Sequence, residues 1–183
     1  ATVPIVVTRV NAALRSDIRP KGRYGFVTLH RPSNVDLRKT LAELLSALDD
    51  VNKDLPLIFP VHPRTAGKMK EFGLSSNMKM IEPVGYLDSL CLMAGATLVL
   101  TDSGGVQEET TVLGVPCLTI RENTERPVTV TEGTNTLVRA GNLVAEARKI
   151  LSGHGKRGRV PKYWDGRAAE RIVQCLVDHP PKK

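Results

Sequence analysis

The clearest chemical pattern in the chain is formed by Ser103, Gly104 and Gly105, within the stretch Thr101–Glu109. The apolar run before them, Thr97–Leu100, predicts a strand, and the residues after them have helical character. A tight turn would thus lead into a helix whose first backbone N–H groups have no partner and carry the positive end of the helix dipole. Paired glycines let a phosphate approach these groups, while Ser103 offers an N-cap or a hydroxyl donor. The pattern predicts an anion site, with an ordinary capped helix as the alternative.

Glu109 stands more than one helical turn beyond the glycine pair. At that place its carboxylate can accept hydrogen bonds from a ribose diol, so the whole stretch suits a nucleotide. The alternative is an acidic residue that only favours the N-terminal half of its helix. A glycine pair before a helix is less specific than a P-loop or a dinucleotide fingerprint, and the sequence contains neither.

Two pairs of basic residues follow other predicted strands. His30 and Arg31 close the first strand and would face phosphates at the sheet edge, although a histidine at a strand end is often purely structural. His62 and Arg64 hold the corresponding place on the next strand, where the alternative is a turn shaped by Pro63.

Arg126 precedes Pro127, which suits the first position of a helix, and its guanidinium can reach a phosphate or a ribose. The alternative for Arg126 is a surface ion pair with Glu125, which would contribute little stability. The four histidines show no metal-ligand spacing, and the motifs of serine hydrolases, P-loop NTPases and nicotinamide enzymes are absent. We therefore expect no metal and no cofactor.

The order of predicted elements would bring these groups together. Strands and helices alternate, which predicts right-handed βαβ crossovers and a mainly parallel, Rossmann-like sheet with helices on both faces. In such an α/β fold the carboxyl ends of the strands meet at one edge, where ligands bind. His30, His62, the turn after Val84, Ser103 and Arg121 all come at such ends. Besides the helix after Ser103, we expect strands at 24–29, 57–61, 78–84, 97–100, 115–120 and 135–138, and helices at 3–18, 37–53, 66–72, 87–94, 143–151 and 167–177.

Composition limits the class of protein. With 183 residues, 41% hydrophobic and 25% charged, the chain suits one globular domain. No apolar run approaches the ~20 residues of a membrane span, and no signal-peptide pattern precedes the first strand, so we expect a cytoplasmic protein without a membrane partner. The three cysteines are far apart in apolar contexts, which favours free thiols. The net charge of +7 suits either a nucleic acid or a small anionic ligand.

The segment Arg23–Val27 resembles part of the octamer of RNA-recognition motifs, whose aromatic side chains stack on bases. Gly22 and Leu29 stand where that octamer has a basic residue and an aromatic one. In a parallel sheet, Tyr24 and Phe26 would moreover be buried. An RNA-binding module is therefore only a remote alternative, and we expect no nucleic-acid partner.

Five motifs, in order and over nearly the whole chain, resemble the UDP-N-acetylglucosamine 2-epimerase family, specifically its C-terminal half. They are Thr28-Leu29-His30-Arg31 with Asn34-Val35-Asp36, Pro60-Val61-His62-Pro63-Arg64-Thr65, Gly85-Tyr86-Leu87-Asp88, Thr101 to Glu109, and Thr124-Glu125-Arg126-Pro127. The family has a glycosyltransferase-B-like fold of two Rossmann-like domains with the active site between them. The resemblance implies a linker helix from a missing N-terminal domain at 1–20, a UDP-binding domain at 21–178 and a tail at 179–183.

The resemblance also implies roles for the candidate residues. The UDP site would comprise His30, Arg31, Val84, Ser89, Ser103, Gly104, Gly105, Glu109 and Arg126. The serine and glycines would bind the diphosphate, Glu109 the ribose hydroxyls, and the backbone of Val84 the uracil. By the same similarity, His30 would act in both binding and catalysis, while His62 and Arg64 would contact an effector or a phosphate.

The reaction implied by the resemblance interconverts UDP-N-acetylglucosamine and UDP-N-acetylmannosamine, in cell-envelope polysaccharide biosynthesis. UDP is eliminated to leave a glycal and then added back with C2 inverted, without nicotinamide or metal. Because the missing domain supplies the acidic residues at the sugar carbon, this chain alone would bind UDP without epimerising, and the complete enzyme would be a homodimer. The alternatives within enzymes are a hydrolysing epimerase and a related UDP-sugar glycosyltransferase.

Two positions depart from the family pattern. Ser33 stands where relatives often carry a glutamate, two residues after the histidine-arginine pair. Ser89 stands where relatives usually carry an aromatic residue, which predicts a looser uracil pocket.

Overall fold

Parallel strands form one sheet in the order β3-β2-β1-β4-β5-β6 in a computed structural model, which describes residues 19–179. The strands are β1 Gly25–Thr28, β2 Leu57–Pro60, β3 Lys79–Ile81, β4 Leu98–Thr101, β5 Cys117–Ile120 and β6 Asn135–Val138. The strand order reverses between β1 and β4, as in doubly wound folds. This topology confirms the expected Rossmann-like α/β architecture.

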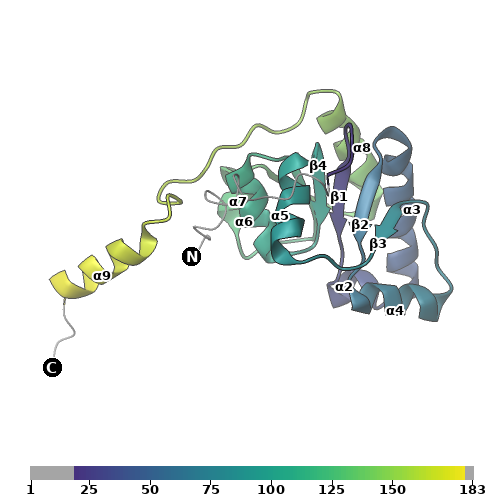
Figure 1. The fold of residues 1–183 in the computed structure, drawn as a ribbon, viewed down its shortest axis with the longest axis horizontal. Coiled ribbons are helices and arrows are strands. Elements are labelled where there is room, and N and C mark those ends of the chain that lie inside the picture. Colours follow the sequence, from purple (N-terminus) through teal and green to yellow (C-terminus); the bar gives the residue numbers. More distant parts are fainter. Residues whose placement is uncertain (1–18, 180–183) are drawn as a thin grey trace.

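Helices cover both faces of this sheet (Figure 1). They are α2 Pro32–Val35, α3 Arg38–Asp54, α4 Pro63–Phe72, α5 Tyr86–Gly95, α6 Gly104–Leu113, α7 Pro127–Thr131, α8 Ala140–Leu151 and α9 Ala168–Asp178. Helices α3 and α8 pack on one face of the sheet, and α5 and α6 pack on the other. The layers leave the carboxyl edge of the sheet to the loops that carry the candidate residues.

Strand side chains alternate between two buried clusters, because successive residues of a strand point to opposite faces. Val27 and Leu100 pack against α3 and α8, whereas Phe26 and Val99 pack against α5 and α6. Burial on both faces explains why the strands read as short apolar runs. Tyr24 and Phe26 are 3% and 1% exposed, so the aromatics of the RNA-like segment are not open to bases.

Two helices that begin at a proline differ from the sequence-based expectation. Helix α4 begins at Pro63 rather than at residue 66, because a proline ring suits the first helical turn and His62 caps the helix. The cap is formed by Nδ1 of His62, which accepts the backbone N–H of Arg64 at 3.1 Å. The short helix α2, which begins at Pro32, was not expected.

Other boundaries shift by a few residues. The strand expected at 78–84 is restricted to β3, and the helix expected at 143–151 begins three residues earlier as α8. The helix expected at 3–18, most of the linker expected at 1–20 and most of the tail at 179–183 lie outside the described residues.

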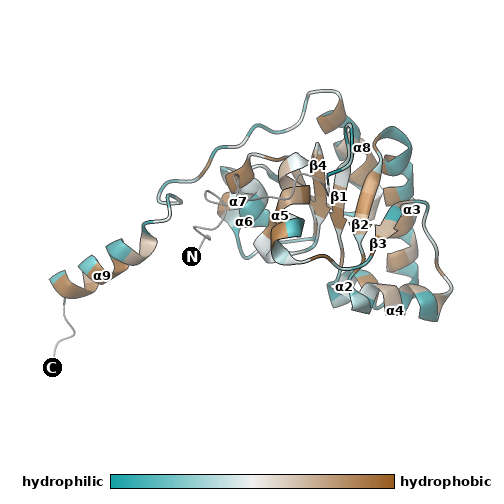
Figure 2. Ribbon diagram, viewed as in Figure 1, coloured by the Kyte–Doolittle hydropathy of each residue, from teal (hydrophilic) through white to brown (hydrophobic). Residues whose placement is uncertain are grey.

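Helix α9 extends away from the sheet at the end of a long connection (Figure 1). None of its residues is buried, yet four apolar side chains lie on it at helical spacing (Figure 2). These are Ile172, Val173, Leu176 and Val177, each at least 59% exposed. Within residues 19–179, no helix has both the length and the apolar character needed to cross a membrane.

The central strand β4 generates a stability prediction. Leu100 is fully buried between the sheet and α3, so Leu100→Ala should lower the free energy of unfolding by about 3 kcal/mol through lost burial and a residual cavity. Leu87→Ala is the control, because that side chain is 54% exposed, and a change within about 0.5 kcal/mol is expected. Equal effects of the two substitutions in urea denaturation would contradict the described core.

Candidate functional site

The buried carboxylate of Asp102 joins the end of β4 to the loop after β1. Its oxygens accept the backbone N–H of His30 at 3.1 and 3.2 Å and that of Arg31 at 2.9 Å. They also accept the side-chain amide of Asn34 at 3.1 Å, and Nδ1 of His30 lies 3.1 Å from Oδ1. Adjacent strands β1 and β4 end level with each other, which brings these groups together. Asp102 therefore sets both the backbone and the ring position of His30.

Asp102 and His30 stabilise each other's charged forms. The hydrogen bond to Asp102 raises the pKa of the His30 imidazole above 6.5, against the opposing effect of burial. Burial alone would raise the pKa of the Asp102 carboxyl, but the hydrogen bonds from His30, Arg31 and Asn34 outweigh it and leave the pKa lowered. The His30 side chain is still 38% exposed. The pairing thus favours the protonated form of His30 at the point where the strand order reverses.

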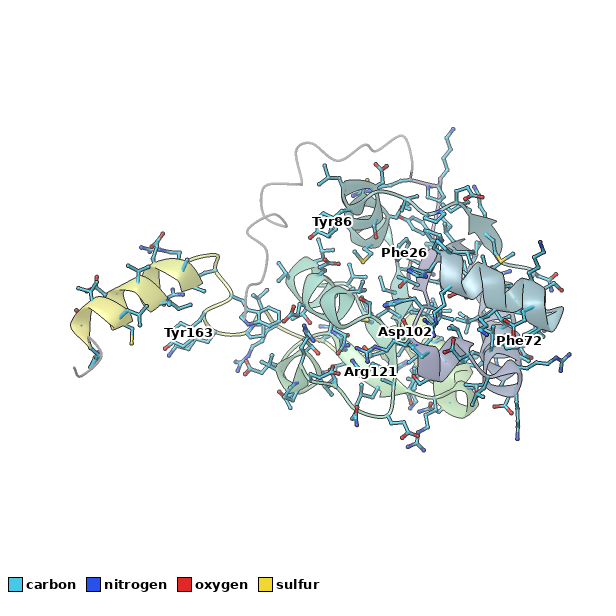
Figure 3. All side chains as sticks on the ribbon, turned by 90° about the horizontal axis from the view of Figure 1, so that it is seen from below. Phe26, Phe72, Tyr86, Asp102, Arg121 and Tyr163 are labelled. Carbon is cyan, nitrogen blue, oxygen red and sulfur yellow. The ribbon has the colours of Figure 1, made fainter. Side chains whose placement is uncertain are left out.

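Arg31 is fixed by the same loop. Its Nε donates to the backbone carbonyl of Asp102 at 2.9 Å, and Asn34 also donates to the carbonyl of Ile120 at 3.0 Å. Arg121, which follows β5, lies next to Asp102 (Figure 3), and the Asp102 charge contributes to the raised pKa of its guanidinium, after the larger effect of Glu125. The ends of β1, β4 and β5 therefore form one connected polar cluster.

Helix α6 begins with Gly104 and Gly105, directly after Ser103. The Ser103 N–H donates to Oγ1 of Thr101 at 3.0 Å, while its own hydroxyl makes no capping hydrogen bond. A Cβ on Gly105 would meet nothing within 4 Å, whereas one on Gly104 would lie 2.8 Å from Nη1 of Arg126. The start of α6 thus faces open space at one glycine and an arginine at the other.

Arg126 is tied to α6 through its side chain and its backbone. Its Nε lies 3.2 Å from Oε1 of Glu108, although this buried nitrogen makes no directed hydrogen bond. Its backbone N–H donates to Oγ1 of Thr124 at 3.0 Å, and that hydroxyl donates to Oε1 of Gln107 at 2.6 Å. Gln107 in turn donates to the carbonyl of Ser103 at 3.1 Å. This chain of bonds fixes the Arg126 loop against the start of α6.

Glu109 lies one turn further along α6 and is 9% exposed. Burial raises the pKa of its carboxyl above 4.5, opposed by a hydrogen bond from the Tyr86 hydroxyl at the start of α5. Val84, just before that helix, packs with the α5–α6 cluster, and Ser89 lies in the first turn of α5. Tyr86, Ser89 and Glu109 therefore belong to two neighbouring helices on the same face of the sheet, and Val84 lies just before one of them.

His62 and Arg64, the two candidate residues of the second histidine motif, lie in different environments. The rings of His62 and His30 lie 5.4 Å apart between centroids, so His62 borders the cluster. Arg64 instead binds Asp36, with Nε 3.0 Å from Oδ1 and a second bond from Nη2 to Oδ2. The guanidinium of Arg64 is therefore already engaged by a carboxylate.

Three residues that organise the site had no role in the sequence-based prediction: Asp102, Gln107 and Tyr86. All three lie inside motifs that resemble the family, but the sequence did not indicate which residues they contact. Asp102 and His30, for example, are separated by 72 residues. In the described part of the chain, no group of three or more His, Cys, Asp or Glu side chains is arranged to hold a metal ion.

Comparison with known proteins identifies the relatives of this chain. The family model for UDP-N-acetylglucosamine 2-epimerase matches residues 2–177. The UDP-N-acetylglucosamine 2-epimerase of Methanocaldococcus jannaschii is 42% identical over 163 residues, which cover 84% of this chain and 44% of that protein. The enzyme of the same name from Methanococcus maripaludis is 40% identical over 174 residues, covering 88% of this chain and 46% of the relative.

A solved structure agrees with these matches. The crystal structure of the Methanocaldococcus jannaschii enzyme in complex with UDP-GlcNAc and UDP superposes with a TM-score of 0.76 at 40% identity. The superposition covers 96% of this chain and 49% of that chain. This chain therefore spans about half the length of the relatives it matches.

The ion pair between His30 and Asp102 can be tested by pH titration. His30 should show a pKa above 6.5 by NMR, and Asp102→Asn should bring it to 6.5 or below, because only the lowering effects of burial and of the Arg31 charge remain. The substitution should also cost ~2 kcal/mol of the free energy of unfolding, because it weakens hydrogen bonds to a buried charge. Since the folded pKa of His30 is raised and that of Asp102 is lowered, this loss should be largest between about pH 4 and pH 6.5. It should shrink as the pH rises through the raised pKa of His30, and also as the pH falls through the lowered pKa of Asp102.

Asp36→Asn is the matched control, since that carboxylate pairs with the exposed Arg64 and should leave both the His30 titration and the stability nearly unchanged. A His30 pKa that is the same in the wild-type chain and in Asp102→Asn would contradict the described pairing.

Proposed function

The chain belongs to the UDP-N-acetylglucosamine 2-epimerase family, and on that premise we propose that it holds the UDP portion of a UDP-sugar. The observation that carries the proposal is the open start of α6, where Gly104 and Gly105 are the first helical residues. It lies at the reversal of strand order, where doubly wound folds bind their ligands. Unpaired amides and the helix dipole favour a phosphate there.

In the proposed site the diphosphate lies between these amides and a set of cations. The Ser103 hydroxyl and the amides of α6 contact one side of it, and His30 and Arg126 contact the other. When the bond between sugar and UDP breaks, negative charge builds up on the diphosphate. Donors that are already fixed, as His30 is by Asp102, stabilise that charge without reorganisation. We assign His30 a catalytic role on this ground.

The nucleoside is proposed to lie between α5 and α6. Glu109 is near enough to the start of α6 for its carboxylate to accept the ribose hydroxyls, and the Tyr86 hydroxyl orients that carboxylate. The backbone of Val84 and the side chain of Ser89 then border the uracil. Arg31, held by Asp102, adds positive charge near the diphosphate.

We propose that the complete enzyme interconverts UDP-N-acetylglucosamine and UDP-N-acetylmannosamine by eliminating UDP and adding it back. The name of the Methanocaldococcus jannaschii relative and its crystallisation with UDP-GlcNAc and UDP support this substrate. Because this chain spans about half of such an enzyme, we expect it to bind UDP without epimerising. Product analysis of the complete enzyme separates epimerase from hydrolysing epimerase and glycosyltransferase. Homodimerisation, which the family resemblance implies, and a cytoplasmic location, which the sequence pattern favours, stay predictions.

We also propose that the apolar face of α9 packs against the other half of the enzyme. Four apolar side chains exposed together on one helix are unusual at a protein surface that contacts only solvent. All of α9 except its last residue lies within the range that the family model matches. The relatives are about twice as long as this chain, so a second domain is available to cover the helix.

The nucleotide site generates a binding prediction. Gly105→Ala should weaken UDP binding roughly tenfold or more in calorimetry, because the methyl group would stand where the phosphate approaches the amides. The backbone there is helical, so stability should be unchanged or raised by up to about 1 kcal/mol. Ser103→Ala and Glu109→Ala should also weaken UDP binding.

Gly67→Ala is the matched control, because Gly67 is also helical, in α4, with open space around its Cβ position. It should leave UDP affinity unchanged. Wild-type affinity in Gly105→Ala, Ser103→Ala and Glu109→Ala alike would refute the site assignment.

If α9 packs against the other half of the enzyme, substitutions on its apolar face should affect the complete enzyme but not this chain. In this chain, Ile172→Ser combined with Leu176→Ser should leave the melting temperature unchanged, because neither side chain is buried. In the complete enzyme the same pair should lower stability and activity, because the covered apolar area is lost. Gln174→Ser, between them in the same helix, is the control and should have little effect in either protein. Full activity of the double variant would contradict the proposed packing.

A further inference from the structure

We propose that Glu125 is an internal anion that competes with the nucleotide diphosphate for an arginine cluster, and so limits how tightly the nucleotide is held. The arginine cluster consists of Arg31, Arg121 and Arg126. The inference rests on the proposed function, because it takes the start of α6 as the diphosphate site. It adds a residue that determines affinity without itself binding the ligand.

The Glu125 carboxylate lies between the three guanidinium groups. Both of its oxygens accept hydrogen bonds from Arg121, at 2.7 Å each. Nη2 of Arg31 is 3.8 Å from Oε1, and Nη1 of Arg126 is 4.0 Å from Oε2. Arg31 comes from the loop after β1, whereas Arg121 and Arg126 stand at the two ends of the loop between β5 and α7; all three converge on this one carboxylate.

Two arginines of the cluster also border the proposed diphosphate site. Nη1 of Arg126 lies 2.8 Å from where a Cβ on Gly104 would stand, directly over the start of α6. Arg31 is anchored on the backbone carbonyl of Asp102, the residue before Ser103. An anion bound at the first amides of α6 therefore meets the same guanidinium groups that Glu125 now approaches.

Glu125 binds Arg121 more closely than it binds Arg31 and Arg126, so a diphosphate can replace it at the two weaker contacts. The paired bonds to Arg121 are short, and the Arg121 side chain is only 8% exposed, so Arg121 anchors Glu125 in place. The contacts to Arg31 and Arg126 are at the limit of ion-pair distance, and Glu125 itself is 59% exposed. A diphosphate can thus displace Glu125 from Arg31 and Arg126 while the pair with Arg121 remains.

The Glu125 carboxyl is held in its charged form at neutral pH by the neighbouring arginine. Hydrogen bonding to Arg121 lowers the pKa of its carboxyl to about 2. It therefore repels an incoming diphosphate as well as occupying its cations. Because the carboxylate faces solvent, the effect is screened, and a moderate change in affinity is expected.

Glu108 also pairs with Arg126, but it fits this role less well. Its side chain is 16% exposed and contacts Arg126 alone within the cluster, at 3.2 Å from Nε. Glu125, in contrast, connects all three arginines and lies on the exposed side of them. The competition is therefore assigned to Glu125.

The test is calorimetric titration of this chain with UDP-GlcNAc, whose diphosphate diester does not titrate near neutral pH. Glu125→Gln keeps the shape of the side chain and removes its charge, so binding should tighten roughly threefold to tenfold at low salt. The gain should shrink at high salt, because exposed charges are screened. Glu125→Ala should also bind more tightly than the wild-type chain, which excludes an effect peculiar to the glutamine.

Glu122→Gln is the matched control, since it removes the same charge from the same loop but from a residue paired with Arg139. The affinity of Glu122→Gln for UDP-GlcNAc should equal that of the wild-type chain. If the wild-type chain binds and both Glu125 variants bind equally well or more weakly, Glu125 supports the loop rather than competing, and the inference is overturned. If the wild-type chain does not bind UDP-GlcNAc, the proposed function fails and the inference fails with it.

Discussion

A single buried carboxylate, that of Asp102, connects the two strands between which the sheet reverses. A charge in that position is costly unless it is paired and hydrogen-bonded, so the loop after β1 must present its donors to it. His30 and Arg31 do so from that loop, and Asn34 does so from helix α2, which follows it. The same contacts that offset the burial of Asp102 also favour the charged form of His30 and hold its ring in place at the sheet edge.

Charge at this edge is balanced rather than simply positive. Each member of the arginine cluster faces a glutamate: Arg121 binds Glu125, which Arg31 also approaches, and Arg126 lies against Glu108. Such pairing keeps a strongly basic site stable without a ligand, and leaves cations that an incoming diphosphate can take over. The free start of α6 contributes the remaining positive charge through its amides. Affinity for a nucleotide then depends on how much more strongly these arginines bind the diphosphate than they bind the carboxylates of Glu108 and Glu125.

The sequence predicted correctly those features that depend on residues close together in the chain. Apolar runs and the glycine pair predicted the strands, the sheet edge and the start of α6, because each depends on neighbouring residues. The start of α2 at Pro32 and the cap formed by His62 were missed, since they depend on backbone geometry in a loop. The roles of Asp102 and Tyr86 were also missed, because their partners lie far away in the chain. Spacing alone gave no means to foresee that Arg64 is engaged by Asp36.

The central claim is that a nucleotide diphosphate binds the first amides of α6 at the reversal of the sheet. An NMR titration of this chain with UDP tests it most directly, by following every backbone amide at once. The account predicts the largest shifts, downfield as expected for amides that donate to phosphate, at Gly104 and Gly105, with the His30 ring shifting in parallel. Saturable shifts confined to another part of the chain, with both glycine amides unmoved, would contradict it.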